Sequence, residues 1–387
     1  MKTIHRVIYA DASNMDAVSS ESVDLMVTSP PYPMIEMWDE MFARQDASVK
    51  LALADGNGTD AFELMHRVLD PVWKEVYRVL KSGGFACINI GDATRTLNGN
   101  FALYPNHMRI LKNALEIGFS ALPCILWRKQ TNAPNKFMGS GMLPAGAYVT
   151  LEHEYLLVLR KGSKREFKKE ADKKIRRESA VFWEERNSWF SDVWFDVKGA
   201  QQAINDKDAR LRSAAYPFEV AYRLINMYSA KGDTILDPFL GTGTTTAAAM
   251  ASGRNSIGYE IDSTLVNIID RIKDVIIDSS KALIRKRLAK HMAFVVDRLK
   301  TKGEFKYGNE HYGFPVMTAQ ERELIFNDPM RITAPEKNTF AVEYAKRPQP
   351  EFCKDWPAEL LKHKTDVVDS GRQDDASEKD PAREALF

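Results

Sequence analysis

The chain has 387 residues, of which 44% are hydrophobic and 28% charged, and its formal net charge at pH 7 is +1. This length predicts one large domain with additions, or two domains, and the composition agrees with an intracellular enzyme. The three cysteines, Cys87, Cys124 and Cys353, are too widely spaced for a disulfide framework or a zinc cluster, so we expect no metal. Because no apolar stretch approaches a membrane span and residues 1–11 lack the apolar core of a secretory signal, we expect a cytoplasmic protein that contacts no membrane.

The first informative segment is Thr28-Ser29-Pro30-Pro31-Tyr32, which follows a predicted strand at 23–27. Successive prolines fix φ, remove two N–H donors and leave carbonyl groups free to point into a site. An exocyclic amino group donates two hydrogen bonds, which Ser29 Oγ and the Pro30 carbonyl could accept, and Tyr32 could stack on a base that has left its duplex. The candidate catalytic residues are therefore Ser29, Pro30, Pro31 and Tyr32. For this motif alone, a Pro-Pro turn that merely closes a strand is the alternative.

Predicted helices and strands alternate after this motif. Asp70-Pro71 is typical of a helix start, and Gly83-Gly84 is expected to stop that helix. The pattern further predicts strands at 85–90, 119–128 and 154–160 and a helix at about 105–116. This alternation indicates a doubly wound α/β sheet of the Rossmann-like kind.

Two features of the middle of the chain need separate interpretation. Cys124 follows a proline, but it lies in the apolar run of the strand at 119–128, so we interpret it as a buried structural residue and not as a nucleophile. The glycine- and proline-rich segment 131–147 is predicted to be a loop. It is either a mobile wall over the target base or a plain surface loop.

A basic stretch from Arg160 to Arg177 precedes a group of aromatic residues that ends at Trp194. Basic side chains attract phosphates without reading sequence, whereas aromatic side chains can pack against bases. We therefore place a target-recognition region at 161–212. Its candidate DNA contacts are Lys173, Lys174, Arg176 and Arg177. A solvated charged helix followed by a small aromatic core is the alternative.

The second motif is a glycine loop at 237–245, between a predicted strand at 233–237 and a predicted helix at 244–250. Gly241 and Gly243 allow a tight turn and a close approach to a ligand, and the free N–H groups of the helix start suit the carboxylate of a methionine-containing donor. The strand at 256–260 ends in Glu260, placed where an acid commonly meets ribose hydroxyls. A P-loop or a dinucleotide site fits less well, because Gly-Lys-Ser/Thr is absent and Thr246 stands where a third small residue is required.

Taken together, the two motifs resemble those of the β-group of DNA amino-methyltransferases, in which a Ser/Asp-Pro-Pro-Tyr half precedes a Phe-x-Gly-x-Gly half. The resemblance covers roughly residues 4 to 265. The segment 9–13 is similar to the one whose acid, here Asp11, contacts the donor's adenine. One departure is Arg212-Ser213-Ala214, which stands where the family often has a histidine.

The resemblance implies S-adenosylmethionine as methyl donor, no metal, and a set of donor-binding residues. These are Asp11, Asp237, Phe239, Gly241, Gly243, Thr244, Thr245 and Glu260. Ser-Pro-Pro-Tyr is commoner among N4-cytosine enzymes than among N6-adenine enzymes, so the implied product is N4-methylcytosine in DNA. N6-adenine methylation, RNA amino-methylation, a catalytically silent DNA-binding subunit and a nicotinamide oxidoreductase are the alternatives. Double-stranded DNA, a cognate restriction endonuclease and a second copy of the chain are the candidate partners, in a prokaryotic cytoplasm.

The predicted organisation has five parts. They are a catalytic half at 1–160, the recognition region at 161–212, a donor-binding half at 213–275, a mainly helical C-terminal extension at 276–365 and a disordered acidic tail at 366–387. Within the extension, an amphipathic helix is predicted at 281–302 and is expected to dock on the body of the protein.

Overall fold

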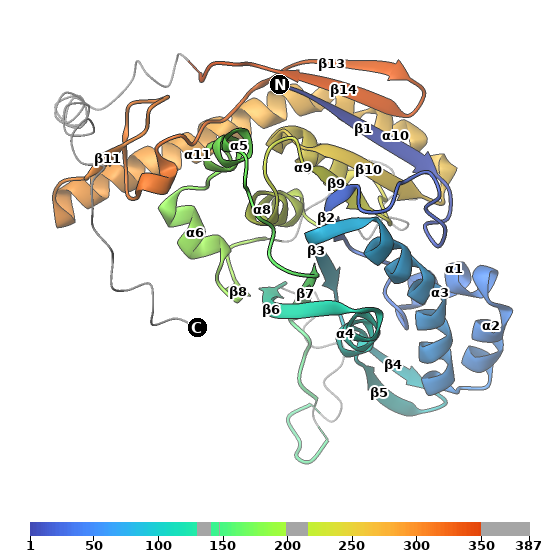
Figure 1. Ribbon diagram of the computed structural model, residues 1–387. Coiled ribbons are helices and arrows are strands. Elements are labelled where there is room, and N and C mark those ends of the chain that lie inside the picture. The colour runs from blue at the N-terminus through green and yellow to red at the C-terminus, as the bar shows by residue number, and fades with distance from the viewer. Residues whose placement is uncertain (130–140, 147, 199–215, 350–387) are drawn as a thin grey trace.

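A ten-stranded sheet runs through the molecule (Figure 1), in a computed structural model that describes residues 1–129, 141–146, 148–198 and 216–349. In spatial order its strands are β13 (Pro329–Glu336), β14 (Thr339–Tyr344), β1 (Lys2–Tyr9), β10 (Asn255–Glu260), β9 (Thr234–Asp237), β2 (Val23–Thr28), β3 (Leu80–Ile90), β7 (His153–Lys161), β6 (Phe119–Arg128) and β8 (Val193–Trp194). β1, β10, β9, β2 and β3 are mutually parallel, whereas β7 is antiparallel to β3 and β14 is antiparallel to β1. The carboxyl ends of the five parallel strands therefore meet at one edge, which we call the carboxyl edge.

Helices cover both faces of this sheet, which confirms the predicted doubly wound α/β fold. Along β2, Leu25 and Val27 pack in one apolar cluster with α8 and α9, whereas Met26 packs in a second cluster with α3 and α4. The helices are α1 (Asp39–Gln45), α2 (Ala47–Ala54), α3 (Gly58–Val79), α4 (Asn106–Ile117), α5 (Glu170–Glu178), α6 (Trp183–Trp189), α8 (Phe218–Tyr228), α9 (Thr244–Ser252), α10 (Val266–Asp270) and α11 (Ile272–Lys302). Smaller elements are the 3-10 turns at Glu36–Trp38, Ser263–Leu265 and Ala319–Glu321 and the strand pairs β4 (Ala93–Leu97) with β5 (Asn100–Tyr104) and β11 (Tyr307–Gly308) with β12 (Pro315–Val316).

The predicted helix start at Asp70-Pro71 is wrong, because both residues lie inside α3. The helix begins after Asn57, whose side chain accepts a hydrogen bond from the N–H of Asp60 at 3.2 Å. Buried apolar residues continue at helical spacing on both sides of the proline, and this packing outweighs the roughly 3 kcal/mol cost of an interior proline. The helix ends at Val79, and Gly83-Gly84 belongs to β3 instead of marking the helix end.

The described part of the C-terminal extension, residues 276–349, contains strands as well as the predicted helix. Its long helix α11 begins at Ile272 and contains the predicted segment, but the chain then returns as the hairpin β13–β14. β14 pairs with β1, Thr3 opposite Val342, so the extension adds two strands to the central sheet (Figure 1). Sequence periodicity predicted the amphipathic helix but did not show that β13 and β14 pair with each other and with β1.

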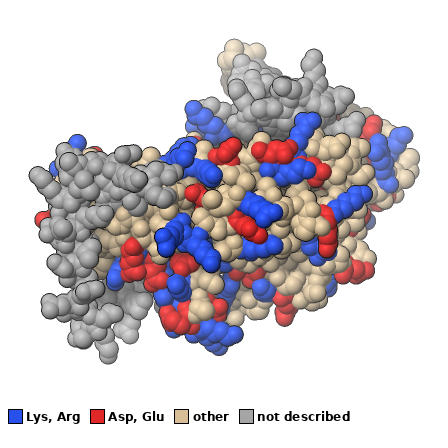
Figure 2. Space-filling view, turned by 90° about the horizontal axis from the view of Figure 1, so that it is seen from above, with Lys and Arg blue, Asp and Glu red and all other residues tan. Residues whose placement is uncertain are grey.

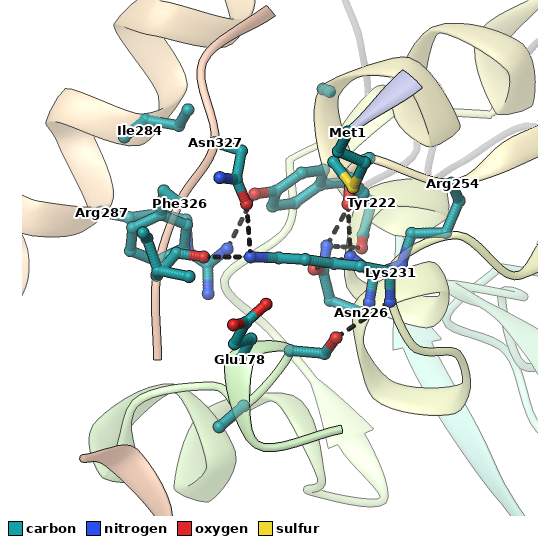
Figure 3. Close-up of a pocket in the computed structure, with 16 residues that line it drawn as sticks. Met1, Glu178, Tyr222, Asn226, Lys231, Arg254, Ile284, Arg287, Phe326 and Asn327 are labelled. Carbon is teal, nitrogen blue, oxygen red and sulfur yellow. Dashed lines mark hydrogen bonds between the residues drawn. The ribbon is translucent and has the colours of Figure 1, made fainter. Parts of the chain in front are cut away.

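A partly buried lysine lies where the C-terminal extension meets the segment after α8. Figure 3 shows Lys231 extended between α8 and the extension, with its amino group directed at Asn327. The Nζ atom donates hydrogen bonds to the Ile325 carbonyl at 2.5 Å and to Asn327 Oδ1 at 2.7 Å. Burial lowers the pKa of Lys231 to about 7. The adjoining cavity has a volume of about 20 Å³, which is room for a single water molecule and not for a ligand.

Candidate active site

The two sequence motifs meet at the carboxyl edge, because β2 and β9 are neighbouring parallel strands. Thr28 ends β2 and Asp237 ends β9, and the Thr28 hydroxyl donates a hydrogen bond to Asp237 Oδ1 at 2.5 Å. The other carboxylate oxygen accepts from Thr245 Oγ1, also at 2.5 Å, and Oδ1 accepts from the N–H of Phe239 at 3.0 Å. Asp237 thereby joins residues 28–32, which hold the predicted catalytic residues and which we call the catalytic segment, to the glycine loop.

Asp237 acts inside the protein and does not line the cavity described below. Its side chain is fully enclosed, and burial raises its pKa to about 6 although three hydrogen bonds favour the charged form. The Thr245 hydroxyl lies in turn 2.5 Å from the hydroxyl of Tyr216. These two predicted donor-binding residues, Asp237 and Thr245, therefore position the loop from beneath.

Glu260 ends β10 beside the glycine loop. Its Oε2 accepts a hydrogen bond from the N–H of Gly241 at 2.7 Å, and its Oε1 accepts from the N–H of Asp262 at 2.8 Å. Burial raises the pKa of this carboxyl group, and the two backbone hydrogen bonds oppose that rise. Since each carboxylate oxygen has a second lone pair, Glu260 can hold the loop and still accept hydrogen bonds from two vicinal hydroxyl groups.

A cavity of about 700 Å³ opens at the carboxyl edge between the two motifs. This volume lies within the usual range for small-molecule sites. The cavity is lined by the predicted residues Asp11, Ser29, Pro30, Pro31, Phe239, Gly241, Thr244 and Glu260, together with apolar side chains of α3 and the segment 37–41. Gly241 adopts φ +57°, and no protein atom lies within 4 Å of where its side chain would begin, so the loop leaves open space there. Paired acceptors on Glu260, the backbone N–H groups at the start of α9 and an apolar wall suit a nucleoside that carries an amino-acid tail.

Gly243 has a different reason to be glycine from the one that we predicted. It is the N-cap of α9, it adopts φ +86°, and a side chain there would begin 2.5 Å from Ile272 Cδ1. It does not line the cavity. The left-handed backbone conformation therefore favours glycine here, and close packing against Ile272 adds to that preference.

Ser29 and Tyr32 belong to a four-residue polar cluster, which we call the catalytic cluster, with Asn89 and Glu154. The Tyr32 hydroxyl donates to Glu154 Oε2 at 2.9 Å and lies 3.1 Å from Ser29 Oγ. Asn89 Nδ2 lies 2.8 Å from the Tyr32 oxygen, 2.8 Å from Glu154 Oε2 and 3.3 Å from Ser29 Oγ. Burial raises the pKa of Tyr32 well above its usual value, and the negative charge of Glu154 raises it further. The phenol therefore stays protonated. Tyr32 is not among the residues that line the cavity, but Ser29 is.

Sequence reasoning did not select Asn89, Glu154 or Lys129 as site residues. Asn89 is near the end of β3, Glu154 is near the start of β7, and Lys129 follows β6 and places its Nζ 2.8 Å from Glu154 Oε1. The available signal was a buried-strand pattern interrupted by a polar residue, once as Asn89 and once as Glu154. Both are buried in the structure, and a buried carboxylate requires partners.

The four candidate DNA contacts lie on α5, away from the cavity. The chain reaches α5 from Lys161, at the end of β7 opposite to Glu154, and the Lys161 amino group donates to the Leu80 carbonyl at the start of β3. Within α5, Arg177 pairs with Glu323 at 2.6 Å and with Glu170 at 3.0 Å. Lys173 lies 3.5 Å from Glu170, Lys174 lies 3.9 Å from Glu178, and the Arg176 guanidinium lies over the Phe167 ring. On the face drawn in Figure 2, basic and acidic residues are interspersed.

The aromatic residues that follow α5 contribute mainly to packing. Phe182, Trp189 and Trp194 are buried, whereas Trp183 and Phe190 are partly exposed. A bidentate ion pair between Arg287 of α11 and Glu185 of α6, with an Nη2–Oε2 distance of 2.5 Å, fixes α6 against the extension. The predicted recognition region is described only to residue 198.

Cys124 lies in β6, as predicted, and is partly buried. Across the described residues there is no group of three or more His, Cys, Asp or Glu side chains arranged to hold a metal ion. No helix in the described ranges is both long and apolar enough to cross a membrane. The loop predicted at 131–147 lies largely outside the described residues, and the tail at 366–387 lies wholly outside them.

Comparison with known proteins gave three informative kinds of match. The model of the N6/N4 DNA methylase family matches residues 23–271. The type II methyltransferase M.MthZI of Methanothermobacter thermautotrophicus is 48% identical over 345 residues, which cover 89% of this chain and 96% of that protein. M.MjaI of Methanocaldococcus jannaschii is 52% identical over 279 residues, or 69% of this chain and 90% of the relative. A solved Thermus thermophilus protein described as a putative DNA modification methylase, complexed with S-adenosyl-L-methionine, is 29% identical with a TM-score of 0.55 over 70% of this chain and 94% of its own.

Proposed function

Because the chain belongs to the N6/N4 DNA methylase family, we propose that it transfers a methyl group from S-adenosylmethionine to N4 of a cytosine flipped out of double-stranded DNA. The chain is an S-adenosylmethionine-dependent DNA methyltransferase of the type II kind. A cognate restriction endonuclease in a prokaryotic cytoplasm and a second copy of the chain are the partners that we propose for it.

The observation that carries the choice of base is the neutral hydroxyl of Ser29 at the cavity wall. Ser29 and Pro30 both line the cavity, so a serine oxygen and a backbone oxygen could each accept one hydrogen from an amino group. Two such hydrogen bonds would hold both hydrogens to one side and direct the nitrogen lone pair to the other. The resemblance of Ser-Pro-Pro-Tyr to the N4-cytosine enzymes supports the same assignment.

The remaining residues position the two substrates. Bound S-adenosylmethionine supplies an electrophilic methyl group on a sulfonium centre. Glu260 and the start of α9 would hold the ribose and the amino-acid tail, and Asp11, which lines the same cavity, would contact the adenine. The Thr28–Asp237 hydrogen bond fixes the distance between this donor site and Ser29. Catalysis then derives mainly from alignment and electrostatics, without a covalent enzyme intermediate.

Nucleoside mass spectrometry of DNA treated with the enzyme and the donor tests this proposal. We expect N4-methylcytosine, identified against chromatographic standards. N6-methyladenine would keep the donor site but overturn the choice of base. 5-Methylcytosine that disappears in Cys124→Ser would overturn the mechanism, and the absence of any methylated base with a bound donor would indicate a silent subunit.

A further inference from the structure

We propose that Ser29, Tyr32 and Glu154 form a proton relay that removes the proton released when the amino nitrogen of the base is methylated. This inference rests on the proposed methyl transfer to an amino group and names the residue that receives the proton. Glu154 is 122 residues away from Tyr32 in sequence, and only the pairing of β7 with β3 brings it to the catalytic segment.

The directions of the hydrogen bonds follow from the chemistry of Glu154. A carboxylate only accepts, so the Tyr32 hydroxyl hydrogen points to Glu154 Oε2, and the Tyr32 oxygen is left as an acceptor. Asn89 must present its Nδ2 to the same carboxylate, because that contact also requires a donor. Its two hydrogens are then used in the two contacts of 2.8 Å, with Glu154 and Tyr32.

Ser29 is therefore free to donate its hydrogen to Tyr32. The Ser29 Oγ to Tyr32 oxygen distance is 3.1 Å, whereas the contact with Asn89 Nδ2 is longer, at 3.3 Å. With the serine hydrogen directed at Tyr32, the Ser29 lone pairs remain for the amino group at the cavity wall. The chain of donors thus runs in one direction, from the base through Ser29 and Tyr32 to Glu154.

The step balances in atoms and charge. The amino nitrogen forms a bond to the methyl carbon, and the carbon–sulfur bond breaks with its electron pair remaining on sulfur, which becomes a neutral thioether. The nitrogen, now positively charged, gives one hydrogen to Ser29 Oγ while the Ser29 hydrogen moves to the Tyr32 oxygen and the Tyr32 hydrogen moves to Glu154 Oε2. A neutral methylated base and a protonated Glu154 result, and Ser29 and Tyr32 are restored.

Two further contacts fit Glu154 to this role. The Lys129 ammonium lies 2.8 Å from Glu154 Oε1, the carboxylate oxygen that Tyr32 does not use. The Lys129 side chain is 51% exposed, whereas the Glu154 side chain is 11% exposed. The proton on Glu154 therefore has a route to water on the side that faces Lys129. Gly91 provides the space: a side chain there would begin 3.1 Å from the Tyr32 ring and 3.3 Å from Glu154 Cγ.

The decisive variant is Glu154→Gln, because it keeps the size of the side chain and removes the proton acceptor. Under single-turnover conditions with saturating DNA and donor, we expect the methylation rate to fall about a hundredfold, within the usual contribution of a general base. Donor affinity and the identity of the methylated base should not change. Glu152→Gln is the matched control, since Glu152 is two residues away and pairs with Arg128 at 3.1 Å. A wild-type rate in Glu154→Gln, or a loss confined to donor or DNA affinity, would overturn the relay.

The pH dependence of the single-turnover rate separates proton transfer from support of the loop. The groups that face Glu154 are Lys129 from the end of β6, Tyr32 from the catalytic segment and uncharged Asn89 from β3. A general base works only when it is unprotonated, so wild type should lose rate at acid pH, and Glu154→Gln should lack this loss while Lys129→Met keeps it. A loss of rate at acid pH that is the same in Glu154→Gln as in wild type belongs to another group, such as Asp237, and contradicts the proposal.

Tyr32→Phe interrupts the same relay at a second residue. This variant tests the relay if Glu154→Gln does not fold. The phenylalanine retains the ring but cannot pass a proton, so its rate should fall by a similar factor. The double variant should be no slower than the slower single variant, because both interrupt one path. Additive losses would contradict the relay. Mass spectrometry of the product tests the base assignment separately, since a relay from Ser29 would serve an adenine amino group equally well.

Discussion

Thr28 donates a hydrogen bond to Asp237 at 2.5 Å, across 209 residues of sequence. The hydroxyl belongs to the strand that leads into Ser29, and the carboxylate belongs to the strand that leads into the glycine loop. Asp237 also accepts hydrogen bonds from the Thr245 hydroxyl and from the N–H of Phe239. One buried side chain therefore fixes the catalytic segment relative to the proposed donor site.

Asp237→Asn should change how stability depends on pH. The pKa of Asp237 is raised by burial to about 6 in the folded protein, above its usual value of about 3.9 in an unfolded chain. Between these values the folded state binds more protons, so wild type loses stability as pH rises from about 4 through about 6. The asparagine variant should lack this loss, as measured by urea unfolding at pH 5 and pH 7. Thr28→Val, which removes a hydrogen bond to the charged form, should extend the wild-type loss to higher pH. If the stability of Asp237→Asn depends on pH as that of wild type does, Asp237 is not the source of the loss of stability.

Glu260→Ala should weaken binding of S-adenosylmethionine by about 1.5–3 kcal/mol, the usual range for hydrogen bonds to a charged group. The variant loses both the proposed ribose contact and the anchor of Gly241. Calorimetric titration with the donor measures the affinity, and thermal unfolding without donor reports the anchor alone. Glu343→Ala is the control, because Glu343 lies in β14 opposite Lys2, at the start of β1 and away from the carboxyl edge. Unchanged donor affinity would remove Glu260 from the site.

Ser29→Ala should lower the single-turnover methylation rate about tenfold to a hundredfold, corresponding to roughly 1.4–2.7 kcal/mol of transition-state stabilisation. Donor affinity should stay near the wild-type value, because Ser29 faces the base. Ser120→Ala, on the exposed side of β6, should leave both quantities unchanged. If the rate does not fall, the Pro30 carbonyl alone orients the amino group and Ser29 does not carry the proton.

Replacing Lys173, Lys174, Arg176 and Arg177 with glutamine should weaken DNA binding and reduce its dependence on salt, without changing the base that is methylated. Fluorescence anisotropy at several salt concentrations measures the slope. Lys286→Gln with Lys290→Gln, on the exposed side of α11, is the comparison. A slope that falls only in the α11 variant would move the DNA-binding surface to that helix.

Lys231→Met should remove a rise of stability at alkaline pH. Burial lowers the pKa of Lys231 to about 7, below its usual value of about 10.4. Between these values the unfolded state binds more protons, so wild type gains stability as pH rises, by on the order of 1 kcal/mol per pH unit, and loses it as pH falls through 7. Urea unfolding at pH 7 and pH 9 should show the gain in wild type only. An equal gain in the variant would assign it to another group.

Local patterns predicted most single elements of this fold. β6 spans the predicted range 119–128. α4 and α9 differ from their predicted ranges by one or two residues. The error at Pro71 arose because a local rule for helix starts competed with a tertiary stripe of buried residues that runs through the proline. Propensity is weaker than packing in such a case.

That the glycine loop and Ser29 would lie at one site was predictable, because each motif is contiguous in the sequence. Glu154 and Lys129 were not. The contact of Glu154 with Tyr32 depends on the pairing of β7 with β3, and the contact of Lys129 with Glu154 depends on the pairing of β6 with β7. The pairing of β14 with β1 has the same origin. Strand order is a property of the whole chain, and a local window of sequence does not contain it.

The hairpin β13–β14 also determines how copies of this protein can associate. By covering β1, it makes β13 one outer strand of the sheet, and the other outer strand, β8, has only two residues. β13 begins with a proline, contains a second at Pro335, and exposes Arg331 and Glu336. Prolines, charges and short length each discourage the addition of a foreign strand. Among the described parts of the chain, a homodimer would therefore join through helices or loops and not by extending the sheet, and the same features protect the folded protein against edge-to-edge aggregation.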